Sequence, residues 1–211
     1  MSKVFLDMEN FPRKAHFEHF SKMAFPWVGI TANVDITAFR KEIKEKGEPF
    51  FLALLYRTVL AGNSVPEFRQ RISGGKIVQY DFCRASFTLA LSDGTYCYCK
   101  PPRYDLPFEE FLPLALDAEK EAKENAGIED GDDAAELFFV SSMPWVSFTS
   151  VIEPFDYPAD SNPRLMFGKF FEQEGKTFLP VSTLTHHALT DGRHIGAFYE
   201  NLLKLLNGEK I

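Results

Sequence analysis

Residues 179–198, LPVSTLTHHALTDGRHIGAF, join two kinds of sequence pattern at one polar turn. Before the turn, the apolar and β-branched run that starts at Arg164 and folds back at QEGK (residues 173–176) predicts a β-hairpin. After the turn, TDGRHIGAFYENLLKLLNG has helical spacing, and Thr190 or Asp191 can cap its first turn. A strand that runs directly into a helix is therefore the unit around which the fold is built.

The same patterns place secondary structure along the rest of the chain. Helices are predicted within residues 13–23, 36–47, 49–63 and 107–127, and Pro113 should perturb the first turns of the last one. An acidic loop is expected at 127–136, and strands are predicted within residues 27–37, 76–91, 95–100 and 136–155, the last one broken at Pro144. Runs of strands with helices beside them predict an α+β fold, a two-layer mixed β-sheet covered by helices, in one domain over residues 1–211.

Composition limits the possible partners. The 211 residues are 45% hydrophobic and include 22 phenylalanines, enough for a sizeable core. The net charge is −7 and no basic stripe is visible, which argues against a nucleic-acid partner. No run approaches the roughly 20 apolar residues of a membrane helix, so no membrane partner is expected. The absence of a signal-peptide pattern and the odd number of cysteines, three, favour a cytoplasmic location.

Histidine is scarce in this chain, and three of its five histidines lie in the opening stretch: His186, His187 and His194. A histidine at a strand-to-helix turn can be held in a fixed rotamer, and its ordinary pKa of about 6.5 suits a general base. Asp191 is close enough to support the turn, at a helix N-terminus that favours negative charge. The pattern HHxxxDG therefore predicts proton-transfer chemistry.

Three other interpretations stay open from these residues alone. The histidines can be satisfied structural residues of a polar turn. They can form a metal site with His194, although adjacent histidines on a strand point to opposite faces, and we expect no metal. A serine-histidine-aspartate hydrolase is the third, but the chain has no GxSxG pattern and Asp191 follows the histidines too closely.

Beyond the motif, several blocks in order along the chain carry a resemblance. THHALTDGRHIGAFYENLLKLL resembles the active-site signature of the chloramphenicol acetyltransferases, which is shared more loosely with the catalytic domains of dihydrolipoyl acyltransferases. MENFPRKAHFEHF, the block from NVDITAF to EFRQRI, FFVSSMPWVSFTS and LMFGKFFEQEGKTFLPVSTLTHH resemble the other blocks of that family. The resemblance covers essentially the full chain and implies a chloramphenicol acetyltransferase-like fold.

The resemblance implies roles for the residues of the turn. His187 would be the base that removes a proton from a substrate hydroxyl as the oxygen attacks the thioester of acetyl-CoA. Its ring would be oriented through its own backbone carbonyl, which leaves the other nitrogen free. Asp191 would be structural and would pair with Arg13, whose planar guanidinium can hold a carboxylate with two hydrogen bonds.

Other blocks supply the implied partners of the base. Ser141, with Ser142 as the adjacent alternative, matches a serine that hydrogen-bonds the oxyanion of the tetrahedral intermediate. Trp145 and Lys169 match residues that lie near coenzyme A. The family is trimeric with active sites between subunits, so the resemblance implies a homotrimer that binds coenzyme A and a small hydroxyl acceptor.

The sequence departs from the family pattern at two positions of the acceptor pocket. Met166 stands where a threonine is usual, and Phe20 stands where a tyrosine is frequent. Both changes make the pocket more apolar, and methionine cannot donate a hydrogen bond. They motivate two alternatives to chloramphenicol acetylation: an acyltransferase for another acceptor or acyl chain, and a trimeric protein that binds small molecules or coenzyme A with little or no catalysis.

Overall fold

The computed structural model describes residues 2–156 and 160–211, and its largest unit is a seven-stranded mixed sheet. The strand order is β2-β10-β8-β7-β5-β6, with β9 paired to β10. β7 is parallel to β5 and to β8, whereas the other pairs are antiparallel. The strands are β2 (Trp27–Asp35), β5 (Arg84–Ala90), β6 (Tyr96–Cys99), β7 (Leu137–Ser142), β8 (Arg164–Phe167), β9 (Phe171–Gln173) and β10 (Lys176–His186).

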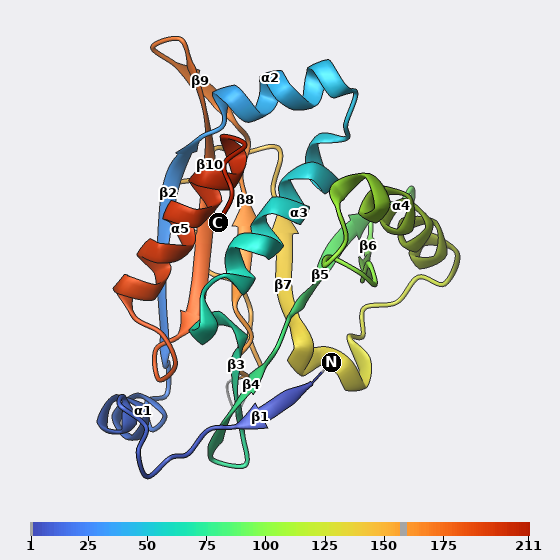
Figure 1. Ribbon diagram of the computed structural model, residues 1–211. Helices are drawn as coiled ribbons and strands as arrows, with labels where there is room; N and C mark the ends of the chain where they lie inside the picture. The colour runs from blue at the N-terminus through green and yellow to red at the C-terminus, as the bar shows by residue number, and fades with distance from the viewer. Residues whose placement is uncertain (1, 157–159) are drawn as a thin grey trace.

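Helices cover one face of this sheet, so the predicted α+β class is confirmed. Figure 1 shows α3 and α5 crossing in front of the strands, with α4 beside β6. The main hydrophobic core lies between these helices and the sheet and includes Phe39, Leu54, Phe111 and Phe198. The covering helices are α2 (Thr37–Lys46), α3 (Phe50–Asn63), α4 (Phe108–Glu124) and α5 (Gly192–Leu206).

The two proline-marked helices form as the sequence predicts. α3 begins directly after Pro49 and buries eight of its fourteen residues, which explains why its sequence is apolar nearly all round. Pro113 lies within α4 without ending it. Among the described residues, none of the helices combines the length and hydrophobicity that a membrane span requires.

A smaller sheet of three strands, β1-β4-β3, was not expected from the sequence. β4 (Lys76–Tyr80) lies within the predicted run 76–91, whereas β1 (Lys3–Phe5) and β3 (Gln70–Ser73) were not predicted, because three or four residues are too few to show a period of two. A second, separate hydrophobic cluster joins this sheet to α1 (Lys14–Phe20) and to the turn after β10. Phe17, Ile77, Ala188 and Leu189 are its buried members.

Three predicted segments differ in detail. The run 76–91 is two strands in two different sheets, separated at residues 81–83. The expected strand over 136–155 ends at Ser142, and the described residues from 143 to 163 have neither helix nor strand. Part of the expected acidic loop is a short 3-10 helix, η2 (Gly131–Glu136). For the two predicted strands, local β propensity alone did not show where the chain leaves the sheet.

Gly62 of α3 lies against the sheet with no room for a side chain. A Cβ atom there would approach the ring of Phe138 to 2.9 Å, and Phe138 is fully buried. We predict that Gly62→Ala lowers the free energy of unfolding by about 1–3 kcal/mol, measured by urea denaturation. Gly196→Ala in α5 is the matched control. A Cβ atom at Gly196 meets open space, and alanine favours the helical conformation more than glycine does. Equal stability losses in both variants would contradict this account of the packing.

Candidate active site

Apolar packing holds the turn that carries the two histidines against the smaller sheet and α1. β10 ends at His186, and α5 begins at Gly192. Between them, Ala188 and Leu189 are buried in the second hydrophobic cluster. The backbone N–H of His187 donates to the carbonyl of Pro26 at 2.7 Å, so the turn is also tied to the start of β2.

The ring of His187 is held in one orientation and one tautomer. Its Nδ1 lies 2.8 Å from the carbonyl oxygen of Thr190. A carbonyl can only accept a hydrogen bond, so Nδ1 carries a proton, and in the neutral ring Nε2 keeps a free lone pair. The ring of Phe20 stacks on the imidazole with its centroid 3.8 Å away.

One expectation about this ring was wrong. We expected the backbone carbonyl of His187 itself to orient the ring, but the carbonyl of Thr190 does so. The turn brings Thr190 back to β10, where its amide donates to the carbonyl of His186 at 3.1 Å and its hydroxyl donates to that of Thr185 at 2.6 Å. Thr190 is therefore a fixed acceptor three residues beyond His187, and the free nitrogen is still Nε2.

His186 occupies a different environment from His187. Its exposed fraction is 4%, and burial lowers its pKa to about 4, so the ring is neutral at pH 7. Its Nδ1 accepts the amide N–H of Ala188 at 3.2 Å, and its ring lies edge-on to Trp27. Of the two adjacent histidines, His186 is therefore a buried structural residue whose Nδ1 has a hydrogen-bond partner.

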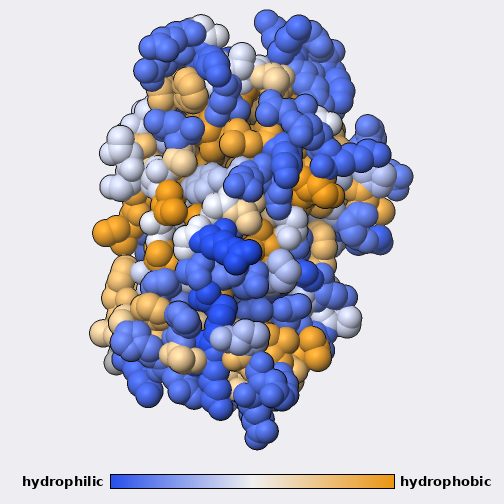
Figure 2. Space-filling model, turned by 60° about the vertical axis from the view of Figure 1, so that its left-hand side comes forward, coloured by the Kyte–Doolittle hydropathy of each residue, from blue (hydrophilic) through white to orange (hydrophobic). Residues whose placement is uncertain are grey.

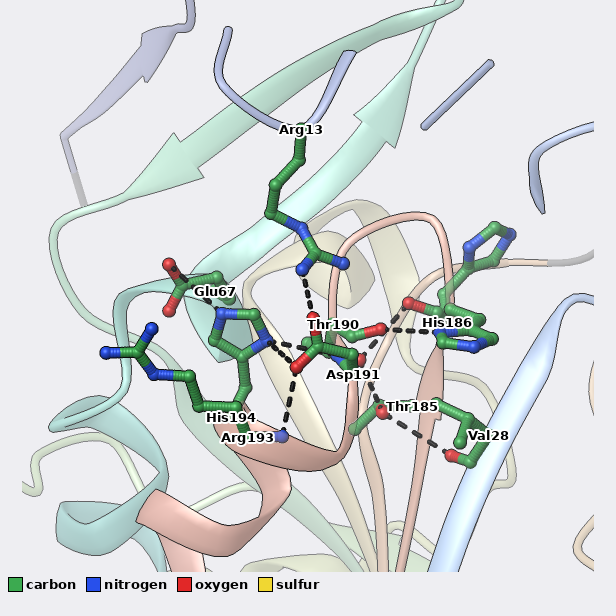
Figure 3. Close-up of polar contacts among 10 residues, drawn as sticks. Arg13, Val28, Glu67, Thr185, His186, Thr190, Asp191, Arg193 and His194 are labelled. Carbon is green, nitrogen blue, oxygen red and sulfur yellow. Dashed lines mark hydrogen bonds and ion pairs between the residues drawn. The ribbon is translucent and has the colours of Figure 1, made fainter. Parts of the chain in front are cut away.

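Asp191 and Arg13 form the predicted ion pair. Nη1 of Arg13 contacts Oδ2 of Asp191, and Figure 3 shows the arginine reaching the helix end from the chain before α1. We expected two hydrogen bonds between the guanidinium of Arg13 and the carboxylate of Asp191, but only Oδ2 contacts Arg13. Oδ1 instead accepts the N–H of Arg193 at 3.0 Å and so caps α5. Burial raises the pKa of Asp191, but the hydrogen bonds from Arg13 and Arg193 outweigh it and bring the pKa below 3.8.

His194 joins the same cap, a role that the sequence did not show. Its Nδ1 accepts the backbone N–H of Asp191 at 3.0 Å, and its Nε2 lies 3.7 Å from Oε1 of Glu67 in η1 (Pro66–Arg69). Among the described residues, the histidine, cysteine and acidic side chains form no group of three or more that could hold a metal ion.

Ser141 lies on the sheet face opposite the helices. Phe138 points toward α3, so the alternation along β7 places Ser141 on the other face. There its Oγ is 3.2 Å from Oγ1 of Thr88, and Met166 is its direct neighbour on β8. Ser142 has the opposite orientation, so of the two candidate serines Ser141 is on the open face.

Within one chain, Ser141 and His187 are not brought together. Ser141 pairs with Met166, and Met166 pairs with Ser182 on β10, four residues before His186. Standard strand geometry puts the end of β10 about 13 Å along the strands and about 10 Å across them from Ser141. One reacting carbonyl group cannot contact both side chains at that separation.

The two residues expected near coenzyme A lie on neighbouring surface segments. Trp145 follows β7 and is 77% exposed, and Lys169 is exposed after β8. The amide of Lys169 donates to the carbonyl of Val146 at 2.9 Å, and the hydroxyl of Ser147 donates to the carbonyl of Lys169 at 2.6 Å. These two hydrogen bonds keep an exposed indole and an exposed ammonium group on adjoining segments.

Comparisons with known proteins identify the family of this chain. The family model for chloramphenicol acetyltransferase matches residues 1–203. The chain is 31% identical over 204 residues to a chloramphenicol acetyltransferase of Clostridium perfringens, covering 95% of this chain and 93% of that protein. It is 30% identical over 200 residues to one from Klebsiella sp, covering 93% and 90%.

Solved structures show the same fold. One chloramphenicol acetyltransferase has a TM-score of 0.81 at 30% identity, covering 97% of this chain and all of that one. A dihydrolipoamide acetyltransferase of Azotobacter vinelandii shares the fold at a TM-score of 0.65 and 21% identity, covering 92% and 86%. The family match and the shared fold show that the protein is an enzyme of the acyltransferase class. The chain belongs to the chloramphenicol acetyltransferase family.

The charge of Asp191 should stabilise the protein in a pH-dependent way. Asn caps helices about as well as Asp, so Asp191→Asn removes mainly the ion pair with Arg13. We predict a loss of about 1 kcal/mol at pH 7, modest because solvent screens a carboxylate that is 35% exposed. A carboxyl with a lowered folded pKa gives its full stabilisation above its unfolded pKa, so the loss should be constant near neutral pH and shrink as the pH falls below about 3.8 through the lower folded pKa.

Thermal unfolding of both proteins at several pH values measures this difference. Asp117→Asn is the control, because Asp117 is an exposed residue of α4 without an ion-pair partner in the described part of the chain. A loss that is independent of pH, or equal in the control, would contradict the ion-pair explanation.

Proposed function

We propose that this protein transfers the acetyl group of acetyl-CoA to a hydroxyl of chloramphenicol or a related small molecule. The observation that carries the proposal is the hydrogen bond from Nδ1 of His187 to the carbonyl of Thr190, which leaves Nε2 with a free lone pair. A neutral imidazole in a fixed tautomer is what a general base for a hydroxyl requires. Membership of the chloramphenicol acetyltransferase family supports this substrate class.

The proposed reaction follows from the position of that lone pair. Nε2 of His187 takes the proton of the acceptor hydroxyl while the hydroxyl oxygen attacks the thioester carbonyl. The carbonyl oxygen becomes an oxyanion, and the tetrahedral intermediate collapses to an ester as the carbon–sulfur bond breaks. The imidazolium of His187 then returns its proton to the departing thiolate, and the free base is regenerated.

Ser141 is proposed to stabilise the oxyanion. Its hydroxyl is held 3.2 Å from that of Thr88, so Thr88 can keep the serine donor aimed at the open face. Removal of one such donor typically costs a factor of about 10²–10³ in kcat. Trp145 is proposed to lie against coenzyme A, and Lys169 to place positive charge near its phosphates.

The separation of Ser141 from His187 supports an active site shared between two chains. About 13 Å along the strands and about 10 Å across them is too far for one tetrahedral centre. We therefore propose the homotrimer that the family resemblance implies, in which His187 of one subunit meets Ser141 of its neighbour. Exposed apolar side chains, among them Phe25, Ile30 and Ile152, support contacts between subunits. Figure 2 shows hydrophobic residues at several places on one face of the molecule.

Phe20 and Met166 are proposed to select the acceptor. The ring of Phe20 stacks directly on His187, and Met166 is adjacent to Ser141, so both lie beside groups of the proposed chemistry. Neither can donate a hydrogen bond to a polar acceptor. This observation favours less polar acceptors, and it also supports the second candidate function, binding of a small molecule or coenzyme A without useful turnover.

The chain as a whole is proposed to be one cytoplasmic domain. Helices and strands from both halves of the sequence share the main core, from Val34 to Leu206. Cys83, Cys97 and Cys99 are free and buried, as expected for a reducing compartment.

The test is acetyl transfer by wild-type protein and by His187→Ala. Thiol release from acetyl-CoA is followed with chloramphenicol and with a panel of small alcohols. We predict that His187→Ala lowers kcat by a factor of about 10³ or more, because the attacking hydroxyl loses its base. His16→Ala, at an exposed histidine of α1, should leave kcat unchanged.

Two outcomes would count against the proposal. If no acceptor gives turnover that depends on His187, the assignment as an acetyltransferase fails. Tight binding of chloramphenicol or coenzyme A by calorimetry without turnover would establish the binding function instead.

A further inference from the structure

One peptide group, between Thr190 and Asp191, is bound by histidines on both sides. Its carbonyl accepts the Nδ1 proton of His187 at 2.8 Å. Its N–H donates to Nδ1 of His194 at 3.0 Å. The two rings are therefore linked through a single planar, polarisable amide.

The contact with the Asp191 N–H indicates which nitrogen of His194 carries the proton. An amide N–H can only donate, so Nδ1 of His194 must offer a lone pair, and the neutral ring carries its proton on Nε2. Nε2 lies 3.7 Å from Oε1 of Glu67. Figure 3 shows the Glu67 carboxylate beside the His194 ring. A protonated ring would have no lone pair, and its Nδ1–H would turn to Oδ1 of Asp191, 3.1 Å away.

We propose that His194, oriented by Glu67, is a positioning residue that fixes the tautomer of His187 through the peptide group 190–191. This inference rests on the proposed function of His187 as the base. Donation of the amide N–H to His194 makes the carbonyl a stronger acceptor, because hydrogen bonds in a chain polarise one another. The carbonyl then holds the Nδ1 proton of His187 and stabilises the imidazolium that forms when Nε2 takes a proton.

The choice of histidine has a physical reason. The third residue of a capping box is usually Glu or Gln, whose side chain accepts the N–H of the capping residue. Here Asp191 and Glu67 already place two carboxylates around that position. A third negative charge would be repelled, whereas a neutral imidazole supplies the same acceptor without charge.

His194→Leu and His194→Gln test the proposal as a pair. Leucine removes the acceptor, and the peptide group can then rotate and release the His187 ring. We expect kcat of His194→Leu to fall by about tenfold or more, with KM for both substrates changed by less than about threefold. Glutamine restores the acceptor, so kcat of His194→Gln should stay within about threefold of wild type. Equal losses in both variants would overturn the proposal.

The tautomer of His187 gives a readout that does not need turnover. In protein labelled with ¹⁵N-histidine, the five rings are few enough to assign by single substitutions. We expect His187 to be the Nδ1–H tautomer in wild type and in His194→Gln, and a tautomer mixture in His194→Leu. An unchanged His187 spectrum in His194→Leu would overturn the proposal even if no acceptor substrate is found.

If His194→Leu does not fold, the ¹⁵N-histidine spectrum of the wild-type protein still tests the proposal. The proposal requires that Nδ1 of His194 carries no proton, because that atom accepts the Asp191 N–H. A protonated Nδ1 would overturn the proposal. Loss of activity in His187→Ala and the state of the His194 ring are measured separately, so failure of the proposed function and failure of this inference are distinguishable.

Discussion

The hydrogen bond between Nδ1 of His187 and the carbonyl of Thr190 is the contact on which the proposed chemistry depends. It decides which nitrogen holds the proton, and so whether the ring can act as a base. Most of the surrounding structure serves to keep that carbonyl in place. The apolar cluster under Ala188 and Leu189 holds the turn, the Thr190 hydroxyl bonds to Thr185, and the pair of Asp191 with Arg13 ties the start of α5 to the chain before α1.

The sequence was informative where side-chain type alone carries the chemistry. The HHxxxDG pattern located the turn, and the hairpin and final helix around it formed as expected. The pair of Arg13 with Asp191, across nearly the whole chain, came from the family resemblance. The partner of the His187 ring could not be read in the same way. It is a backbone carbonyl, which every residue has, and only the path of the turn places that of Thr190 at the ring. The role of His194 was missed for a similar reason, because its partner is a backbone N–H.

The sheet explains why one chain holds only part of the proposed site. Helices cover one face, and Ser141, Thr88 and Met166 lie on the other. His187, the proposed base, lies past the end of β10, whereas Ser141 lies two strands away. The short strands β1 and β3 were not predicted from the sequence. They flank β4, whose Ile77 packs with Ala188 and Leu189 of the turn. Sequence periodicity therefore predicted the layers of the fold but not the distance between the two proposed functional groups.

Complementation between two inactive chains tests the shared site most directly. His187→Ala and Ser141→Ala chains are purified separately, mixed in equal amounts, unfolded and refolded together, and assayed for acetyl transfer. If His187 of one chain works with Ser141 of its neighbour, random assembly restores about a quarter of the wild-type sites. Activity that stays at the level of the separate variants, in mixtures shown to contain both chains in one oligomer, would contradict the account.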